Sequence, residues 1–234
     1  GLTLRIVKSP VKDKLETLYK LLGELKGDSA LVFCNQRESV ERVSNYLTEM
    51  GVDNEYFHGG MEQPERERAL SLFRNGSASV FISTDLASRG LDIPEVKNVI
   101  HYHLPINEEA FIHRNGRTAR MNAEGNAFMI LNEIETVPEY ITREPDEFFL
   151  PEKAKKPLRS EWVRLTINRG KRDKLSKKDV VGFLFQKGGL DKDDLGVVEI
   201  KESCAYAAVK RDKKEGLLAR IRDEKIKNMK AKFI

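Results

Sequence analysis

The 234-residue sequence contains only two cysteines, Cys34 and Cys204, which lie far apart in the chain. This scarcity excludes a disulfide framework and a CxxC metal site, so we expect no metal centre and a reducing, cytoplasmic setting. Long apolar runs are also missing, and without about 18 consecutive apolar residues we expect no membrane-spanning helix. The sequence begins at Gly1 without a basic and then apolar leader, so we expect a piece of a longer protein that is not secreted.

The charge is distributed unevenly along the chain. Residues 1–157 carry 20 Lys and Arg against 25 Asp and Glu, whereas residues 158–234 carry 21 against 12. A small region with so large a positive excess is typical of a polyanion binder, although a merely solubilising surface has a similar composition. The length exceeds that of one typical domain, so we expect two domains with separate cores.

The first part of the chain alternates between helical and strand patterns. Apolar spacing predicts helices near residues 11–25, 40–50, 64–73 and 108–112, and short apolar runs predict strands near 30–34, 56–57, 79–83, 98–102 and 127–131. Short apolar strands separated by helices predict an α/β domain with a parallel sheet covered on both faces. Ligands of such sheets bind at the carboxyl ends of the strands.

The pattern changes after residue 135. Prolines and charges between residues 136 and 157 predict a connector whose end packs loosely. Beyond it, Ser176 and Asp179 form an approximate capping box for a helix, and the order of predicted elements is βαββαβ, with a final strand at 229–233. This is the small α+β plan of RNA-recognition motifs. We therefore expect domains at 1–150 and 160–234, joined by a linker at 151–159.

Three arginines lie within seven residues of the segment HRNGRTAR at 113–120. Guanidinium groups held so close repel one another, so the cluster is typical of a site for a multiply charged anion. A surface patch paired with acidic neighbours is the alternative interpretation.

This segment and three others resemble motifs of DEAD-box RNA helicases in their order and spacing. The other three are VFCNQR at 32–37, HGGM at 58–61 followed by Gln63 and Arg66, and STDLASRGLD at 83–92. The resemblance covers roughly residues 28–135. It implies that the first domain is the second RecA-like domain of such an enzyme.

The resemblance also implies roles for individual residues. Arg117 and Arg120 would be arginine fingers that reach the γ-phosphate of ATP, and Asp92 would contact the ATP ribose. The same nucleotide and interdomain group includes Arg89, His113 and Arg114. The residues implied in RNA binding are Asn35, Arg37, Gly59, Gln63, Arg66, Thr84, Asp85 and Gly90. For Arg66 the local sequence supports the same role without the resemblance. Pro64 predicts the start of a helix here, and the first turn of a helix favours anions.

The sequence departs from the family pattern at two places. Ala119 stands where the arginine-rich motif usually has glycine, so its φ must be negative or strained, and Met121-Asn122-Ala123 replaces a glycine-rich turn. Neither GxxxxGK[ST] nor Asp-Glu-Ala-Asp is present, so we expect an N-terminal RecA-like domain of the same protein to hold the ATP phosphates and Mg²⁺. The chain alone should not hydrolyse ATP.

The basic part resembles the C-terminal RNA-binding domain of DbpA-type DEAD-box proteins. The similar segments are LTINRGKRDK at 165–174, GLDKDDLG at 189–196 and YAAV at 206–209. The resemblance implies recruitment of the helicase to structured ribosomal RNA. Only Tyr206 offers a ring on the central strand, so we expect phosphate contacts to outweigh base stacking. The basic residues expected to contact RNA are Lys171, Arg172, Lys174, Lys227 and Lys230.

Together these patterns predict the C-terminal part of an ATP-dependent RNA helicase that remodels RNA, with ribosomal RNA during ribosome assembly as its expected substrate. A non-enzymatic RNA-binding adaptor that keeps the α/β fold as a platform is the alternative. A dinucleotide-binding enzyme is disfavoured because GxGxxG does not follow the first predicted strand.

Overall fold

The computed structural model describes residues 1–120 and 123–234, so Met121 and Asn122 of the replaced glycine-rich turn lie outside it. The chain divides into two units. The first contains Gly1–Phe73 and Ser79–Arg159, and the second contains Arg74–Ala78 and Ser160–Ile234. Each unit has its own hydrophobic core.

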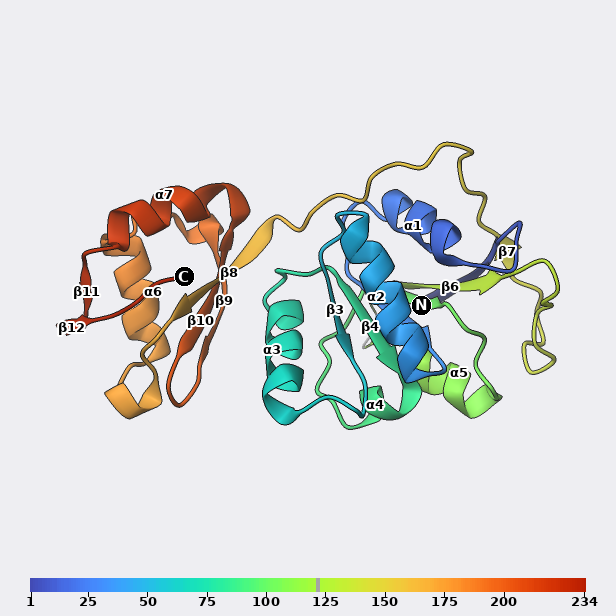
Figure 1. Ribbon diagram of the computed structural model, residues 1–234, viewed down its shortest axis with the longest axis horizontal. Coiled ribbons are helices and arrows are strands. Elements are labelled where there is room, and N and C mark those ends of the chain that lie inside the picture. The colour runs from blue at the N-terminus through green and yellow to red at the C-terminus, as the bar shows by residue number, and fades with distance from the viewer. Residues whose placement is uncertain (121–122) are drawn as a thin grey trace. The chain divides into compact units, whose positions relative to one another are not determined.

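The first unit is built on a parallel sheet of seven strands in the order β3-β4-β2-β5-β6-β1-β7 (Figure 1). The strands are β1 (Leu2–Lys8), β2 (Ala30–Cys34), β3 (Asn54–Phe57), β4 (Val80–Thr84), β5 (Asn98–His101), β6 (Gly125–Leu131) and β7 (Asp146–Glu147). Neighbouring strands pair in parallel throughout. The predicted parallel α/β sheet is confirmed, and it gains β1 and β7, which the sequence patterns did not identify.

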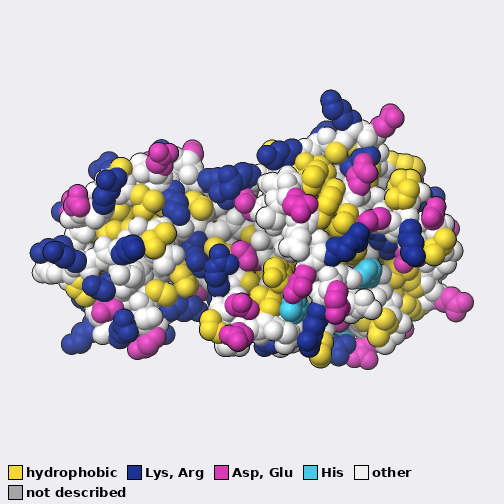
Figure 2. All heavy atoms as spheres, viewed as in Figure 1, with side chains coloured by type: hydrophobic (Ala, Val, Ile, Leu, Met, Phe, Trp, Pro, Cys, Tyr) yellow, Lys and Arg dark blue, Asp and Glu magenta, His cyan; other side chains and the backbone are white. Residues whose placement is uncertain are grey.

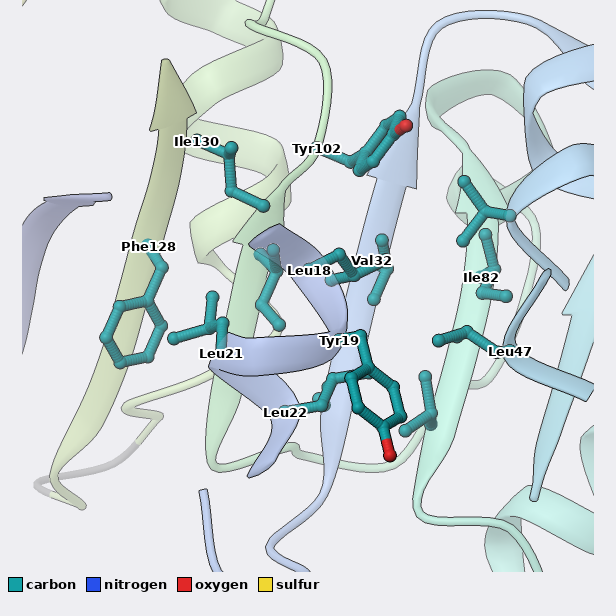
Figure 3. Packing of buried hydrophobic residues seen from close by; sticks show 14 of the residues in the cluster. Leu18, Tyr19, Leu21, Leu22, Val32, Leu47, Ile82, Tyr102, Phe128 and Ile130 are labelled. Carbon is teal, nitrogen blue, oxygen red and sulfur yellow. The ribbon is translucent and has the colours of Figure 1, made fainter. Parts of the chain in front are cut away.

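Helices cover both faces of this sheet. α1 (Leu15–Glu24) and α2 (Arg37–Glu49) pack on one face, whereas α3 (Gln63–Arg74), α4 (Asp85–Arg89) and α5 (Glu108–Asn115) pack on the other. Every residue of β2 and β4 is buried, because alternate side chains enter the two cores. Figure 3 shows Leu18 and Leu21 of α1 packed towards Val32 and Phe128 of the sheet.

The segment after β6 is better packed than the sequence indicated. β7 pairs with β1, and the backbone N–H of Phe148 donates to the carbonyl of Ile6 at 2.8 Å. Phe148 and Leu150 pack on the core beneath α1. The prediction of a loosely packed end was therefore wrong for this stretch, because its apolar side chains cover the otherwise open edge at β1.

The second unit has an antiparallel sheet in the order β8-β10-β9. Its strands are β8 (Trp162–Ile167), β9 (Leu195–Ile200) and β10 (Ala205–Lys210), and its helices are α6 (Lys177–Gln186) and α7 (Arg211–Ile221). The predicted capping box opens α6, since Ser176 Oγ accepts from the N–H of Asp179 and Asp179 accepts from the N–H of Ser176. Both helices contribute to the core on one face of the sheet.

The C-terminal end differs from the predicted strand at 229–233. The chain instead forms a hairpin of β11 (Lys225–Ile226) and β12 (Met229–Lys230). Lys227 and Asn228 adopt φ of 50° and 59°, the left-handed turn that reverses a two-residue hairpin. Only the last residues reach the sheet, where Ile234 and Thr166 of β8 exchange two backbone hydrogen bonds.

Candidate functional site

The carboxyl ends of four neighbouring strands gather most of the predicted site residues of the first unit. His58 follows β3, Asp85 follows β4, Asn35 follows β2, and His103 lies just beyond β5. These strands are neighbours in the order β3-β4-β2-β5, so segments far apart in the sequence meet at one edge. α5, which runs on to Asn115 rather than ending at residue 112, adds the arginine-rich segment there.

Arg114 lies at the centre of this edge and is almost completely buried, with 1% of its side chain exposed. Its Nε and Nη2 donate to both carboxylate oxygens of Asp85 at 2.7 and 2.8 Å, and Nη2 also donates to Asn35 Oδ1 at 2.7 Å. Its Nη1 donates to the carbonyl of His103 at 2.7 Å. All three nitrogens of this guanidinium donate hydrogen bonds to three separate segments of the edge. Arg114 therefore holds these segments together, and its buried guanidinium is not available to a ligand.

His101 extends this buried network. Its Nε2 lies 2.8 Å from Asn115 Oδ1, and its Nδ1 faces Arg114 Nη1 at 3.4 Å. Burial, together with the neighbouring Arg114 guanidinium, lowers the pKa of His101 to about 3, so the ring is neutral. We assign the Nε2–H tautomer because Asn115 Oδ1 accepts that proton. Motif spacing predicted no role for His101 or Asn115, and a histidine at the end of an apolar strand was the available signal.

Arg117 and Arg120 lie just after α5, where the chain turns. Arg117 is partly buried and its Nη2 donates to the carbonyl of Ser88 at 2.7 Å. Arg120 is exposed, and its Nε donates to the carbonyl of Gly116 at 2.8 Å. The pKa of Arg117 is lowered, mainly by burial and to a smaller extent by repulsion from the positive charge of Arg120. An anion beside these two positive charges would reduce their mutual repulsion.

The remaining predicted nucleotide residues lie on the surface beside this pair. Arg89 Nη2 forms an exposed ion pair with Glu109 Oε1 at 3.7 Å, and His113 Nε2 lies 3.7 Å from the same oxygen. Asp92 is exposed just after Gly90, around which a side chain would meet open space. Exposed pairs contribute little to folding, so these side chains can exchange partners at low cost.

The loop after β3 forms a second part of the edge. Arg66 of α3 donates to the carbonyls of Met61 and Gly59 at 2.9 and 3.1 Å, and its guanidinium lies 5.1 Å from the centre of the Phe57 ring. Arg37 is exposed and close to the loop, since a Cβ at Gly59 would lie 3.2 Å from its Nη2. Arg66 therefore shapes the loop, whereas Arg37 adds a charge beside it.

Two further predicted RNA residues lie at the starts of helices. Thr84 caps α4, since its Oγ1 accepts from the N–H of Ala87 at 3.3 Å. Gln63 is the first residue of α3 and is exposed.

In the second unit, two lysine-rich segments lie side by side. Lys227 of the hairpin donates to the carbonyl of Lys174 at 2.6 Å and to Asp179 at 3.3 Å. This contact joins residues separated by 53 positions in the chain. Figure 2 shows Lys and Arg side chains distributed over the visible face of this unit, with hydrophobic and acidic side chains among them. Of the five cations predicted to contact RNA, Lys174 and Lys227 are thus in contact, and the other three lie in the same two segments, namely Lys171, Arg172 and Lys230.

Tyr206 lies on the face of the sheet opposite the helices, beneath a cation of its own unit. The Arg164 guanidinium lies 4.3 Å from the centre of its ring, and Lys210 Nζ lies 4.5 Å from the ring of Trp162 on the same face. The sequence patterns did not identify Trp162 as a second aromatic residue on this face. Both rings are engaged by cations, so stacking a base on the cation-covered side would require those contacts to be displaced.

The part of the chain that the structure describes holds no cluster of three or more His, Cys, Asp or Glu side chains suited to a metal ion. None of its helices is long and apolar enough to cross a membrane.

Each of the two units matches a different family of known proteins. Residues 13–122 match the family model "Helicase conserved C-terminal domain", and residues 164–233 match "DbpA RNA binding domain". The structure is similar to that of E. coli DEAD-box protein SrmB bound to regulator of ribonuclease activity A, with a TM-score of 0.57 and 30% identity over 68% of this chain and 97% of that chain. The chain belongs to the DEAD-box RNA helicase family.

Relatives in this family include two bacterial proteins named ATP-dependent RNA helicase DbpA. The Bacillus subtilis protein is 28% identical over 99% of this chain and 55% of its own length. The E. coli protein is 33% identical over 86% of this chain and 45% of its own length. The chain therefore spans about half the length of these DEAD-box relatives.

Proposed function

We propose that this chain is the C-terminal half of an ATP-dependent RNA helicase, in which Arg117 and Arg120 act as arginine fingers. The observation that supports this most is the pair of guanidiniums just after α5, with Arg117 bound to the Ser88 carbonyl at 2.7 Å. An N-terminal RecA-like domain of the same protein supplies the phosphate cradle and Mg²⁺. This chain by itself hydrolyses no ATP.

In the proposed reaction, water attacks the γ-phosphate while the bond to the leaving phosphate breaks. Negative charge spreads over the transferring oxygens, and positioned guanidiniums stabilise it. Asp92 contacts the ribose, and Arg89 and His113 act at the interface with the other domain. Arg114 acts indirectly, because its bonds to Asp85 and Asn35 fix the edge from which the other residues project.

The proposed RNA path crosses the carboxyl ends of β2, β3 and β4. Arg37 and Gly59 lie together there, and Gln63, Thr84 and Gly90 border the same edge. Binding of RNA and ATP closes the two RecA-like domains and bends one RNA strand so that it unpairs. Hydrolysis then reopens the cleft.

We further propose that the basic domain at 160–234, joined to the domain at 1–150 by a linker at 151–159, selects structured ribosomal RNA in a cytoplasmic assembly pathway. The support is the joining of two lysine-rich segments by Lys227 and Lys174, which concentrates positive charge.

The finger assignment is tested by Arg117→Ala in the intact helicase. Because a positioned arginine contributes about 10³–10⁵ in rate, turnover of ATP should fall to near background while RNA affinity stays within about threefold. ATPase assays and RNA titration measure the two effects. Arg68→Ala, an exposed arginine of α3 paired with Glu55 at 3.9 Å, is the control and should keep wild-type turnover.

Unchanged turnover in Arg117→Ala would refute the finger assignment. Brisk ATP hydrolysis by the isolated chain would refute the division of labour between two domains. An intact protein that binds RNA but never hydrolyses ATP would favour the non-enzymatic adaptor.

A further inference from the structure

His58 has both ring nitrogens engaged at the carboxyl end of β3. Its side chain is buried, its Nδ1 accepts from the backbone N–H of Gly60 at 3.0 Å, and its Nε2 lies 2.8 Å from Glu41 Oε1. Because Nδ1 accepts a hydrogen bond, the ring proton is on Nε2 and is donated to Glu41. The imidazole is therefore held in one tautomer and one orientation.

The loop that follows is shaped around this ring. The N–H of Met61 donates to the His58 carbonyl at 3.2 Å, which closes a turn, and Arg66 fixes the Gly59 carbonyl from the other side. A Cβ at Gly60 would lie 3.1 Å from both Cε1 and Nδ1 of His58, so backbone and imidazole are in close contact. The turn and the ring are therefore in contact through both a hydrogen bond and close packing.

Arg37, the first residue of α2, has its guanidinium beside this loop. A Cβ at Gly60 would lie 3.4 Å from Arg37 Nη1, and one at Gly59 would lie 3.2 Å from its Nη2. The position of the loop therefore limits where this exposed guanidinium can lie. A shift of the Gly59-Gly60 backbone would therefore change the space open to Arg37.

We propose that His58 is a positioning residue for RNA, which acts by holding the Gly60 N–H with Nδ1 and so fixing the Gly59-Gly60 turn and Arg37 for the sugar-phosphate backbone. The inference rests on the proposed function, in which RNA passes this loop. Histidine is suited to the task because one ring supplies an acceptor towards the loop and a donor towards Glu41.

Two substitutions separate the two bonds of the ring. In His58→Asn the amide oxygen takes the place of Nδ1 and still accepts from Gly60, but the bond to Glu41 is removed. In His58→Gln the longer side chain reaches towards Glu41 but leaves the Gly60 N–H without its acceptor. The pair therefore tests which bond matters for RNA.

The experiment measures RNA-stimulated ATP hydrolysis by the intact helicase with a single-stranded oligouridine as probe. His58→Gln should raise the KM for RNA about five- to tenfold, as expected for the loss of one hydrogen bond that orders a binding loop. The kcat at saturating RNA should stay within about twofold, because the fingers are untouched. His58→Asn should keep both constants within about twofold of wild type.

Gly60→Ala provides a second variant if His58→Gln does not fold, as judged by its melting temperature. The added methyl pushes the loop away from the imidazole, so the KM for RNA should rise as it does in His58→Gln. Equal KM values for His58→Asn and His58→Gln, or an unchanged KM in Gly60→Ala, would overturn the positioning role.

Arg37→Ala distinguishes failure of this inference from failure of the proposed RNA path. A raised KM for RNA in Arg37→Ala with a wild-type KM in His58→Gln overturns the role of His58 alone. An unchanged KM in Arg37→Ala overturns the contact between Arg37 and RNA, and with it the part of the path on which the inference rests.

Discussion

At the scale of single residues, Ala119 has a backbone conformation that its side chain disfavours. Its φ is +56°, in the left-handed region where a Cβ crowds the carbonyl oxygen. The sequence indicated that alanine in this motif must have negative φ or be strained, and the structure has the strained alternative. The turn between Arg117 and Arg120 thus keeps the shape that glycine would adopt freely.

We expect Ala119→Gly to stabilise the first unit by about 1 kcal/mol, because relief of left-handed strain outweighs the added flexibility of the unfolded chain. Urea unfolding of wild type and variant measures the difference. Ala87→Gly, in the helical turn α4, is the matched control and should destabilise instead, since glycine is a poor helix former. Destabilisation by Ala119→Gly would show that the conformation carries no strain.

Arg114 shows how the role of a residue depends on its burial. The motif resemblance groups it with residues that act on the nucleotide, but the structure surrounds it with Asp85, Asn35 and the His103 carbonyl. The spacing of residues in the sequence cannot show that Arg114 is buried whereas Arg117, three residues later, is more exposed. The partners that bury Arg114 come from three other segments of the chain.

At the scale of elements, the segment that carries β7 is part of the first unit rather than a loose connector. Phe148 packs on the core, with its ring edge-on to Phe128 at 5.3 Å between centroids and the Arg5 guanidinium 5.9 Å from its centre. The next residue, Phe149, is 80% exposed. Two adjacent residues of one type therefore have opposite environments.

We expect Phe148→Ala to lower the free energy of unfolding by about 2–3 kcal/mol, through loss of burial and the cavity left behind. Phe149→Ala should change it by less than about 0.5 kcal/mol, because an exposed ring packs little against the protein. Urea unfolding of the two variants gives the comparison. Similar losses for both would mean that this segment does not pack as described.

At the scale of the whole molecule, the chain separates an acidic α/β unit from a basic one. The basic unit brings together lysines that the sequence distributes between residues 171–178 and 225–232. Phosphates neutralised by such a surface release counterions, so binding weakens steeply as salt rises. The first unit lacks this concentration of positive charge, so the preference for a particular RNA should reside in the second.

We expect deletion of residues 158–234 from the intact helicase to abolish its preference for a folded ribosomal RNA over a generic duplex. The salt dependence of RNA binding should become shallower by about 0.9 unit of logarithmic slope for each phosphate that the deleted domain neutralised. RNA titrations at several salt concentrations measure both effects. A preference that survives the deletion would place RNA selection in the first unit.

The sequence alone was sufficient for the parallel α/β sheet, the βαββα order of the second unit and the family, because local periodicity and motif spacing encode them directly. It missed β1, the packing of Phe148 and the buried pair of His101 and Asn115. Each of these depends on partners distant in the chain, such as Met129 beside Ile6 and Arg114 beside His101. Only the tertiary structure decided which charged side chains are buried and hold the sheet edge together, as Arg114 does, and which remain exposed, as Arg120 does. The reason is that burial arises only when strands from separate parts of the sequence bring their ends together.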